Sequence, residues 1–413
     1  MNILIALFGN IENDGRVLRS IKTLKKKYQV TNFSYCDKTN FKINNVKLIK
    51  RKSPRNKKNF FELVLFTYQL LKIIFRNKYD FIYLNDYFLT MPINLIYYLK
   101  PSKIIYDAHE LIISERLYKK NNSYKIISKT DENIKKNKYE LIDFFYYLFE
   151  KISIKKVDLI ITANKERALI MKNHYSLKKL PEVVKNIPAN TIKKNLYTRD
   201  ILEKKFKFLK NYNGKIFVYQ GLISSKRKIQ NIVIRLSEIK KSKILIIGNG
   251  EKDYIEYLKN LFKKRSLSNI HFLGNIDLKS LYSILKISNL GIISYSNINL
   301  NNRFCAPNKL YEYAMLNLPM ISTNQIIFKK TFKKYKIGFI YSENKNISKE
   351  YELLIQNINL KKEFKKFNDS NDQSFEAEKL LNAVQKISWW RHNILLCYFI
   401  FYEKILLNKW VKS

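Results

Sequence analysis

The sequence is poor in the residues that build disulfide frameworks, tight turns and metal sites. It has 3 cysteines, 9 glycines, 7 prolines and 4 histidines among 413 residues. Cys36, Cys305 and Cys397 are far apart in the chain, so neither a disulfide framework nor a zinc motif is indicated. This cysteine usage is typical of a protein from a reducing compartment such as the cytoplasm.

Acidic side chains are scarce as well. The 34 Asp and Glu residues are outnumbered by 78 Lys and Arg residues, which gives a formal net charge of +44. Such an excess predicts affinity for a polyanion, among which are nucleic acid, an anionic membrane surface and phosphate-bearing substrates. The alternative is a composition bias, because Lys, Asn and Ile are abundant almost everywhere. No nucleic-acid-binding signature is evident, so we expect no nucleic-acid partner.

Long apolar runs are missing too. No run reaches the length of a membrane-spanning helix. The N-terminal run Met1–Phe8 has no positive segment before it and no cleavage site, so it is typical of a buried first strand rather than of a signal peptide.

The C-terminal tail, residues 388–413, differs from the rest. It holds all three tryptophans of the chain, around the apolar stretch Ile394–Leu407. As a helix this stretch would be about 21 Å long, shorter than the ~30 Å hydrocarbon core of a bilayer. With flanking tryptophans and basic residues it suits a helix lying in the membrane surface. A terminal helix packed on the protein's own surface is the alternative.

Short apolar strands alternate with helical stretches, in two series. Strands are expected at Ile3–Phe8, Gln29–Tyr35, Phe81–Leu84, Ile104–Tyr106 and Leu159–Thr162, and then at Ile216–Tyr219, Ile244–Ile247, Ile270–Leu273, Leu290–Ser294 and Met320–Ser322. The longer helices of the first series are expected at Phe60–Phe75, Phe88–Leu99 and Tyr139–Lys155. This alternation predicts an α/β protein whose parallel sheets are covered by helices on both faces.

The two series predict two domains. We expect an N-terminal domain over residues 1–190 and a C-terminal domain over 191–387, joined by the polar segment Asn186–Tyr197. The last helix, Gln373–Ile387, is expected to complete the second domain. Another polar stretch, Tyr118–Lys138, is expected to be a surface loop.

One segment of the second series, Ala306–Pro319, has a pattern that suits phosphate binding. Pro307 is favourable at a helix start, because the missing N–H costs nothing there. Lys309 and Glu312 are three residues apart, so both lie on one face near that start. The free N–H groups of the first turn and the Lys309 charge can hold a phosphate, and Glu312 can accept hydrogen bonds from ribose hydroxyls. The alternative is a capped helix with a surface ion pair.

The same segment resembles the donor-site motif of the family 4 glycosyltransferases, also called glycosyl transferases group 1, which have the GT-B fold. The residues that fit the motif are Pro307, Lys309, Glu312, Tyr313 and Pro319. Further segments resemble the family in the expected order: Asn13–Val17, Tyr106–Leu111, Val157–Asn164, Asn186 with Pro188, Tyr219–Ile223 with Arg227, and Ile246–Gly250. The resemblance covers residues 1–387 and leaves out the tail.

The resemblance implies a fold, an activity and partners. The fold would be GT-B, two Rossmann-like domains with parallel sheets facing across a central cleft. The activity would be a retaining hexosyltransferase reaction, from a nucleotide-sugar donor to a saccharide or lipid-linked acceptor, in cell-surface polysaccharide or lipopolysaccharide biosynthesis. Members need no metal ion and no cofactor. With the tail and the positive charge, this predicts a cytoplasmic protein at the inner face of the cell membrane, on an anionic surface.

The resemblance also assigns roles. Arg227 matches the family's phosphate-binding arginine, whose planar fork a lysine cannot reproduce. Glu312 matches the residue that holds the ribose, and His109 matches a histidine near the reacting sugar. These three are the expected catalytic residues. The expected donor-binding residues are Gly9, Gly15, Gly221, Arg227, Lys228, Gly248, Pro307, Asn308, Lys309 and Glu312.

The chain departs from the family pattern at one position. Many members carry a second glutamate eight residues before the one that matches Glu312, and Phe304 stands there in this sequence. Two further readings stay open beside the transferase: a GT-B sugar-nucleotide epimerase, which needs no acceptor, and a transferase-like scaffold without activity. The +44 charge is the basis of a third, a basic nucleic-acid-binding protein.

Overall fold

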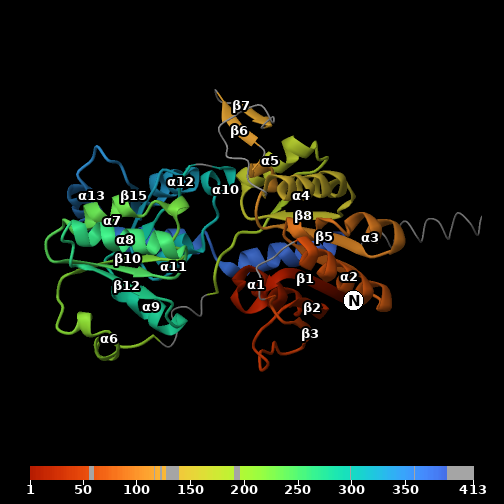
Figure 1. Ribbon diagram of the computed structural model, residues 1–413, viewed down its shortest axis with the longest axis horizontal. Helices are drawn as coiled ribbons and strands as arrows, with labels where there is room; N and C mark the ends of the chain where they lie inside the picture. Colours follow the sequence, from red (N-terminus) through yellow and green to blue (C-terminus); the bar gives the residue numbers. More distant parts are fainter. Residues whose placement is uncertain are drawn as a thin grey trace, which may run out of the picture. The chain divides into compact units, whose positions relative to one another are not determined.

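We describe the protein from a computed structural model, which covers residues 1–54, 60–115, 117–120, 123–126, 139–189, 196–297, 299–357 and 359–387. The chain is built of helices and parallel strands, and it divides into two compact units (Figure 1). Unit 1 is Met1–Lys185 with the residues from Ser374 onward, and unit 2 is Asn186–Gln373.

Unit 1 is built on a seven-stranded sheet in the order β3-β2-β1-β4-β5-β8-β9. Its strands, all parallel, are β1 (Asn2–Asn10), β2 (Gln29–Tyr35), β3 (Val46–Arg51), β4 (Phe81–Asn85), β5 (Lys103–Ala108), β8 (Leu159–Thr162) and β9 (Glu182–Val183). The expected strands of the first series are all present. The sequence reasoning missed β3 and β9, which are less buried and lie toward the sheet edges.

Helices cover both faces of this sheet. They are α1 (Gly15–Leu24), α2 (Phe60–Arg76), α3 (Ile93–Leu99), α4 (Tyr139–Ser153) and α5 (Lys165–Tyr175). Strand β1 is buried on both sides: Ile3 and Ile5 pack in one cluster with Val17 of α1, and Phe8 packs edge-on against Phe66 of α2. A buried strand with this continuous apolar pattern is typical of a sheet enclosed between helices.

Two sequence expectations in unit 1 are wrong in detail. The expected single helix Phe88–Leu99 is a 3₁₀ turn, η2 (Tyr87–Thr90), followed by α3, because Pro92 between them cannot continue a helix. The expected loop Tyr118–Lys138 contains most of an antiparallel pair of strands, β6 (Leu117–Lys120) and β7 (Ser123–Ile126).

Unit 2 is built on a six-stranded parallel sheet in the order β12-β11-β10-β13-β14-β15. Its strands are β10 (Lys215–Gln220), β11 (Ser242–Ile247), β12 (Ile270–Gly274), β13 (Leu290–Ile293), β14 (Met320–Ser322) and β15 (Gly338–Ile340). All five expected strands are present, and β15 was missed. Side chains of β10 alternate between two cores: Ile216 and Val218 face one, Phe217 and Tyr219 the other.

The helices of unit 2 lie on both faces of its sheet (Figure 1). They are α6 (Arg199–Lys205), α7 (Gln230–Ser237), α8 (Lys252–Lys264), α9 (Leu278–Ile287), α10 (Leu300–Arg303), α11 (Asn308–Met315), α12 (Ile326–Tyr335), α13 (Ile347–Ile355) and α14 (Leu360–Asp369).

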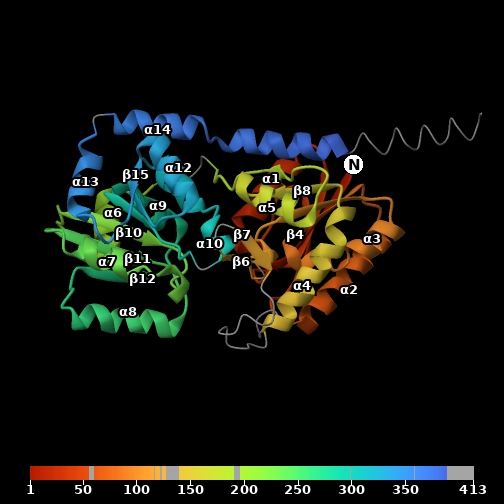
Figure 2. The ribbon, with the colours of Figure 1, turned by 90° about the horizontal axis from the view of Figure 1, so that it is seen from above.

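The helix over residues 373–387 corrects the expected domain limits. We expected it in the C-terminal domain, but Leu380 and Val384 are buried in the core of unit 1, and Glu376 accepts a hydrogen bond from the Lys185 backbone N–H at 2.7 Å. Figure 2 shows this helix, in blue, along α1. The apolar stripe in the sequence reveals that the helix packs against something, but not against which sheet.

Other expectations fall outside the described residues. These are the tail 388–413 and half of the expected link between domains, residues 190–195. Within the residues that the structure covers, no helix is long and apolar enough to cross a bilayer.

Candidate active site

The loops after β10 and β11 in unit 2 approach each other so closely that only glycine fits. Gly221 and Gly248 have φ of +122° and +128°, a region that other residues rarely adopt. A Cβ on Gly248 would lie 2.2 Å from the Gly221 carbonyl oxygen, and one on Gly250 would lie 1.7 Å from that of Ile223. The glycines therefore allow backbone contact at the carboxyl ends of two central strands, where open α/β sheets bind ligands.

Lys309 from α11 reaches this pair of loops. Its Nζ lies 4.4 Å from the centre of the Tyr219 ring, and a Cβ on Gly221 would lie 2.7 Å from that Nζ. Burial, and then the nearby Arg227 charge, lower the pKa of Lys309 to about 7, while Glu312 acts in the opposite direction. An ammonium held in this way gains when a bound anion supplies the missing negative charge.

Glu312 lies one turn further along α11 and is held by β10. The Gln220 side chain, at the end of β10, donates a hydrogen bond from Nε2 to Glu312 Oε2. Helix α11 starts after Pro307, which has no side-chain group to cap the first N–H groups. Its free N–H groups and the Lys309 ammonium therefore occupy the same end of the helix, an arrangement that suits an anion.

Arg227 lies in the turn after β10, at the end of η7 (Ser225–Arg227). Its guanidinium carbon lies 3.9 Å from the centre of the Tyr295 ring, and its backbone oxygen accepts a hydrogen bond from Ser294 Oγ at 2.5 Å. The Tyr295 ring orients the guanidinium, and the hydrogen bond from Ser294 holds the Arg227 backbone. The next residue, Lys228, is exposed and has a φ of +48°.

Three polar atoms in this part of unit 2 are buried without a hydrogen-bond partner among the described residues. They are Gln220 Oε1, Arg227 Nη1 and Asn308 Oδ1. Buried polar atoms are ordinarily paired, because leaving one unpaired costs about 1–3 kcal/mol. Their concentration around Gly221 and the start of α11 indicates a ligand that supplies both donors and acceptors.

Phe304 stands at the position where the resemblance predicts a second glutamate. It follows α10, it is only 8% exposed, and its backbone N–H donates to the Leu300 carbonyl at 2.8 Å. The Arg303 guanidinium lies 5.7 Å from its ring centre. The phenyl ring has no group that can accept hydrogen bonds from a sugar, so this position cannot perform the role of the missing carboxylate.

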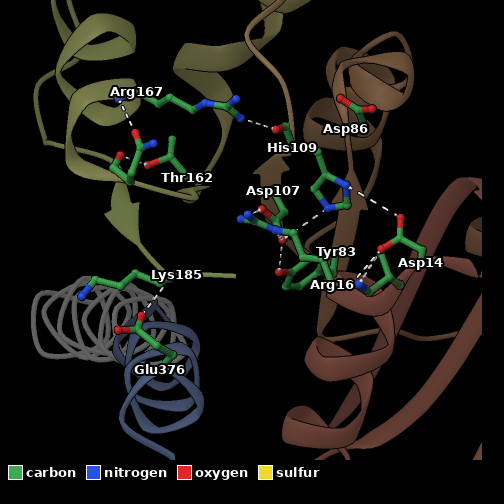
Figure 3. Close-up of polar contacts among 12 residues, drawn as sticks. Asp14, Arg16, Tyr83, Asp86, Asp107, His109, Thr162, Arg167, Lys185 and Glu376 are labelled. Atoms are coloured by element: carbon green, nitrogen blue, oxygen red, sulfur yellow. Dashed lines mark hydrogen bonds and ion pairs between the residues drawn. The ribbon is translucent and has the colours of Figure 1, made fainter. Parts of the chain in front are cut away.

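Unit 1 contains a second cluster, centred on the buried carboxylate of Asp107 in β5 (Figure 3). It accepts hydrogen bonds from Arg16 Nε at 3.1 Å and Tyr83 Oη at 2.8 Å, and it forms an ion pair with the Arg16 Nη2 group. Burial acts to raise the pKa of Asp107, but Arg16 and His109 outweigh it and hold that pKa well below its usual range.

His109 follows β5 and lies between two carboxylates (Figure 3). Its Nε2 is 3.7 Å from Asp107 Oδ2 and its Nδ1 is 3.9 Å from Asp14 Oδ2, both beyond hydrogen-bond length. Burial acts to lower the pKa of His109, but Asp107 raises it overall. Arg167 of α5 fixes the backbone by donating to the His109 carbonyl at 2.5 Å. The imidazole is therefore oriented, and its buried Nε2 has no hydrogen-bond partner among the described residues.

The first loop of unit 1 contacts this cluster through Asp14. This residue caps α1, accepting hydrogen bonds from the N–H groups of Arg16 at 3.1 Å and Val17 at 2.9 Å. Gly15 begins the helix and is exposed, and Gly9 lies near the end of β1. Neither glycine has a positive φ, so their expected role in approaching a donor stays a prediction.

The structure thus gathers the expected residues into two sets. In unit 2, Gly221, Gly248, Arg227, Lys309 and Glu312 lie at the carboxyl ends of β10 and β11 and at the start of α11; in unit 1, His109 lies with Asp14 and Asp107. Sequence reasoning missed the partners Gln220, Tyr295 and Tyr83. Gln220 directly precedes Gly221, which was a usable signal, but nothing in the sequence pairs Tyr295 with Arg227.

One more strand end lies beside the unit 1 cluster. Asp86 follows β4 with a φ of +69°, rare for a residue with a side chain, and its backbone N–H donates to the Asp107 carbonyl at 2.9 Å. Its charge contributes to raising the pKa of His109. Strained backbone of this kind is concentrated at functional sites, and no sequence motif pointed to it.

Comparison with known proteins bears on the family and the fold. Residues 200–370, nearly all of unit 2, match the family model described as glycosyl transferases group 1. No protein of curated function matches the sequence.

Solved structures match over nearly the whole chain. WaaG, a glycosyltransferase involved in lipopolysaccharide biosynthesis, has a TM-score of 0.66 at 14% identity, covering 91% of this chain and 98% of that one. HepE from Anabaena, in complex with UDP and glucose, has a TM-score of 0.64 at 12% identity, covering 95% and 99%. Sucrose-phosphate synthase from Thermosynechococcus elongatus has a TM-score of 0.63 at 11% identity, covering 97% and 99%.

These similarities confirm the expected GT-B fold, with its two parallel sheets. The unit 2 cluster of Arg227, Lys309 and Glu312 lies within the residues that the family model matches. Residues 200–370 therefore resemble the glycosyl transferases group 1 family, in a chain that has the GT-B fold.

Proposed function

We propose that the protein is a retaining glycosyltransferase, which moves a sugar from a nucleotide-sugar to a saccharide or lipid-linked acceptor. The observation that carries this proposal is the unit 2 cluster: Lys309 and Arg227 lie close together beside Gly221, with unpaired polar atoms around them. A leaving nucleoside diphosphate gains negative charge as the glycosidic bond breaks. Cations held in advance at that place lower the barrier, because they need no rearrangement.

In this proposal each residue of unit 2 has a separate task. Arg227, fixed by the Tyr295 ring, binds phosphate oxygens through its planar fork. Lys309 and the free N–H groups at the start of α11 bind the other phosphate oxygens. Glu312, oriented by Gln220, accepts hydrogen bonds from the ribose hydroxyls.

The residues of unit 1 act on the sugar. Arg167 holds the backbone of His109, and Asp107 raises its pKa. In this proposal His109 donates a hydrogen bond to a hydroxyl of the transferred sugar. No protein nucleophile is assigned. The donor's own leaving phosphate takes the proton of the acceptor hydroxyl on the face from which it departs, and this keeps the configuration of the anomeric carbon.

The structural relatives suggest where to look for substrates. The HepE structure contains UDP and glucose, and WaaG is involved in lipopolysaccharide biosynthesis. UDP-sugars are therefore the first donors to test. The acceptor in this proposal is a cell-surface saccharide or its lipid-linked precursor, met by the protein on the cytoplasmic side of an anionic membrane surface.

A donor screen followed by two variants tests the proposal. The nucleotide-sugar that binds should raise the melting temperature, because it binds only the folded state. Glu312→Ala should weaken donor binding by about tenfold or more, the effect of removing a hydrogen bond to a charged group. His109→Ala should lower the transfer rate by a similar factor, with donor affinity retained. Wild-type transfer rates in both folded variants would contradict the assignments.

Incubations with the donor alone and with donor plus acceptor separate the remaining readings. An epimerase would convert the nucleotide-sugar into an isomer without acceptor, and chromatography of the nucleotide-sugar would show it. An inactive scaffold would bind the donor and yield neither isomer nor transfer product.

A further inference from the structure

Three helices of unit 1 expose an unusual number of large apolar side chains. These are Phe60, Phe61, Val64, Leu65, Tyr68 and Phe75 of α2, Leu95, Tyr97, Tyr98 and Leu99 of α3, and Phe144, Phe145 and Ile152 of α4, which together we call the α2–α4 face. Phe61 is 74% exposed and Tyr98 is 70% exposed. Scattered exposed apolar residues are ordinary, but a set on adjoining helices marks an interaction surface.

Helix α2 illustrates the pattern. Its inner side packs on the sheet through Leu63, Phe66 and Leu70, as an ordinary covering helix does. Its outer side carries Phe61 and Tyr68 where a covering helix usually carries charged residues. A helix that carries large apolar side chains on its inner and outer sides needs an apolar neighbour on each.

The three helices form one continuous surface. Lys100, at the end of α3, donates from Nζ to the Phe75 carbonyl of α2 at 3.3 Å, and its Nζ lies 5.0 Å from the Phe75 ring centre. Asn94 of α3 donates to Ser153 Oγ of α4 at 2.9 Å. Lys156, just after α4, lies 4.4 Å from the Tyr98 ring centre. Figure 2 shows α2, α3 and α4 together in this part of unit 1.

The charge of the α2–α4 face has one sign. Among the described residues of the three helices, the exposed charged side chains are Lys72, Arg76 and Lys151. The described carboxylates there, Glu62, Asp143 and Glu150, are half-buried or buried. Glu62 pairs with Arg51, and Glu150 accepts hydrogen bonds from two buried tyrosines. The exposed side chains are therefore apolar or positive.

We propose that the α2–α4 face docks on an anionic lipid bilayer. Tyrosine and phenylalanine rings suit the boundary between headgroups and acyl chains, and lysines beside the rings reach the lipid phosphates. A second copy of the chain fits worse, because it would bring two positive faces together. The inference rests on the proposed function, because a reaction at a membrane surface gives the docking a purpose. It goes further by assigning the membrane contact to these three helices, and this docking needs neither the donor nor the acceptor to be bound.

The test is the binding of the full chain to lipid vesicles without substrates. Flotation is measured with vesicles of phosphatidylcholine alone and with 30% phosphatidylglycerol, roughly the anionic content that reveals an electrostatic contribution. The double variant Phe61→Glu/Tyr98→Glu places charges on the face, and Tyr257→Glu/Leu353→Glu places the same charges on exposed apolar positions of unit 2. A second pair of variants removes positive charge at exposed positions: Lys72→Gln/Arg76→Gln on the α2–α4 face, and Lys263→Gln/Lys264→Gln in unit 2 as the control.

The wild type should bind the anionic vesicles more tightly than the neutral ones. The glutamate variants of the face should bind at least tenfold more weakly, and each basic residue removed from the face should cost about fivefold on anionic vesicles only. The unit 2 controls should bind like the wild type, and melting temperatures should stay unchanged.

Three results would overturn the inference. Face variants that bind like the wild type would move the membrane contact to another part of the chain. A wild type that binds neither vesicle would remove the membrane contact altogether. A concentration-dependent dimer that the face variants abolish, without vesicle binding, would assign the face to a second copy. In each case donor binding by the same preparations shows whether the proposed transferase function survives.

Discussion

At the scale of single residues, Lys309 combines burial with a neighbouring positive charge. Its pKa, lowered to about 7 chiefly by burial, leaves the side chain half protonated near neutral pH. Both phosphates of a nucleotide-sugar stay ionised at neutral pH, and their binding raises the pKa of Lys309 again. Donor affinity should therefore be full below pH 7 and should fall as pH rises above it, by at most about tenfold per pH unit.

Calorimetry can measure the proton involved. At pH 8 the binding of a UDP-sugar should take up protons, so the heat should differ between two buffers with different heats of ionisation. Lys309→Arg, which stays charged throughout, is the matched control and should remove both the proton uptake and the decline of affinity above pH 7. Heats independent of the buffer in the wild type, with constant affinity from pH 6.5 to 8.5, would contradict this account.

Residue types in the two clusters were visible in the sequence, but their partners were not. Lys309 and Glu312 could be placed near one helix start from their spacing alone. The pairing of Arg16 with Asp107 spans two elements far apart in the chain, and no periodicity encodes it. The raised pKa of His109 likewise depends on the fold, because Asp107 acts through space.

At the scale of elements, the packed loops after β10 and β11 determine the shape of the unit 2 site. Gly250→Ala should be strongly destabilising, by about 3 kcal/mol or more, because its Cβ would lie 1.7 Å from the Ile223 carbonyl oxygen, a backbone atom that cannot turn aside. Gly15 begins α1, and a Cβ there would meet only the flexible Arg19 guanidinium, at 3.2 Å. Gly15→Ala should therefore be neutral or stabilising by up to about 1 kcal/mol.

Urea unfolding of the two glycine variants compares these costs directly. Donor binding of Gly250→Ala should be lost together with its stability, since the same loops hold Gly221 beside Lys309. Equal free energies of unfolding for both variants would show that the loops have room to separate.

Strands with strong apolar patterns were predictable, and three of the four edge strands, β3, β9 and β15, were not. Most expected strands have a continuous apolar run, which is the pattern of a strand buried on both faces. Strand β3 is at most half-buried and mixes polar with apolar residues, and β15 is half-buried and only three residues long. The expected helix over Phe88–Leu99 overlooked Pro92, whose position predicts the break that the structure has.

At the scale of the whole molecule, the sequence predicts two α/β units but not which helices belong to each unit. The chain enters unit 2 after Lys185 and returns to unit 1 near Ser374, so its last described helix completes the first core. An amphipathic helix has the same pattern whichever sheet it covers, and only the assembled core selects between them. The same limit concealed the α2–α4 face, since apolar residues in a helical pattern are ordinarily assigned to a core.

The central claim is that unit 2 binds the donor diphosphate through fixed cations. The most direct measurement is the affinity of the full chain for UDP, by calorimetry at pH 6.5, in Arg227→Gln and in Arg265→Gln, an exposed arginine of the same unit. Arg227→Gln should bind about 10-fold to 100-fold more weakly, the loss expected for charged hydrogen bonds, and Arg265→Gln should match the wild type. Equal affinity in Arg227→Gln and the wild type, with both proteins folded, would contradict the account.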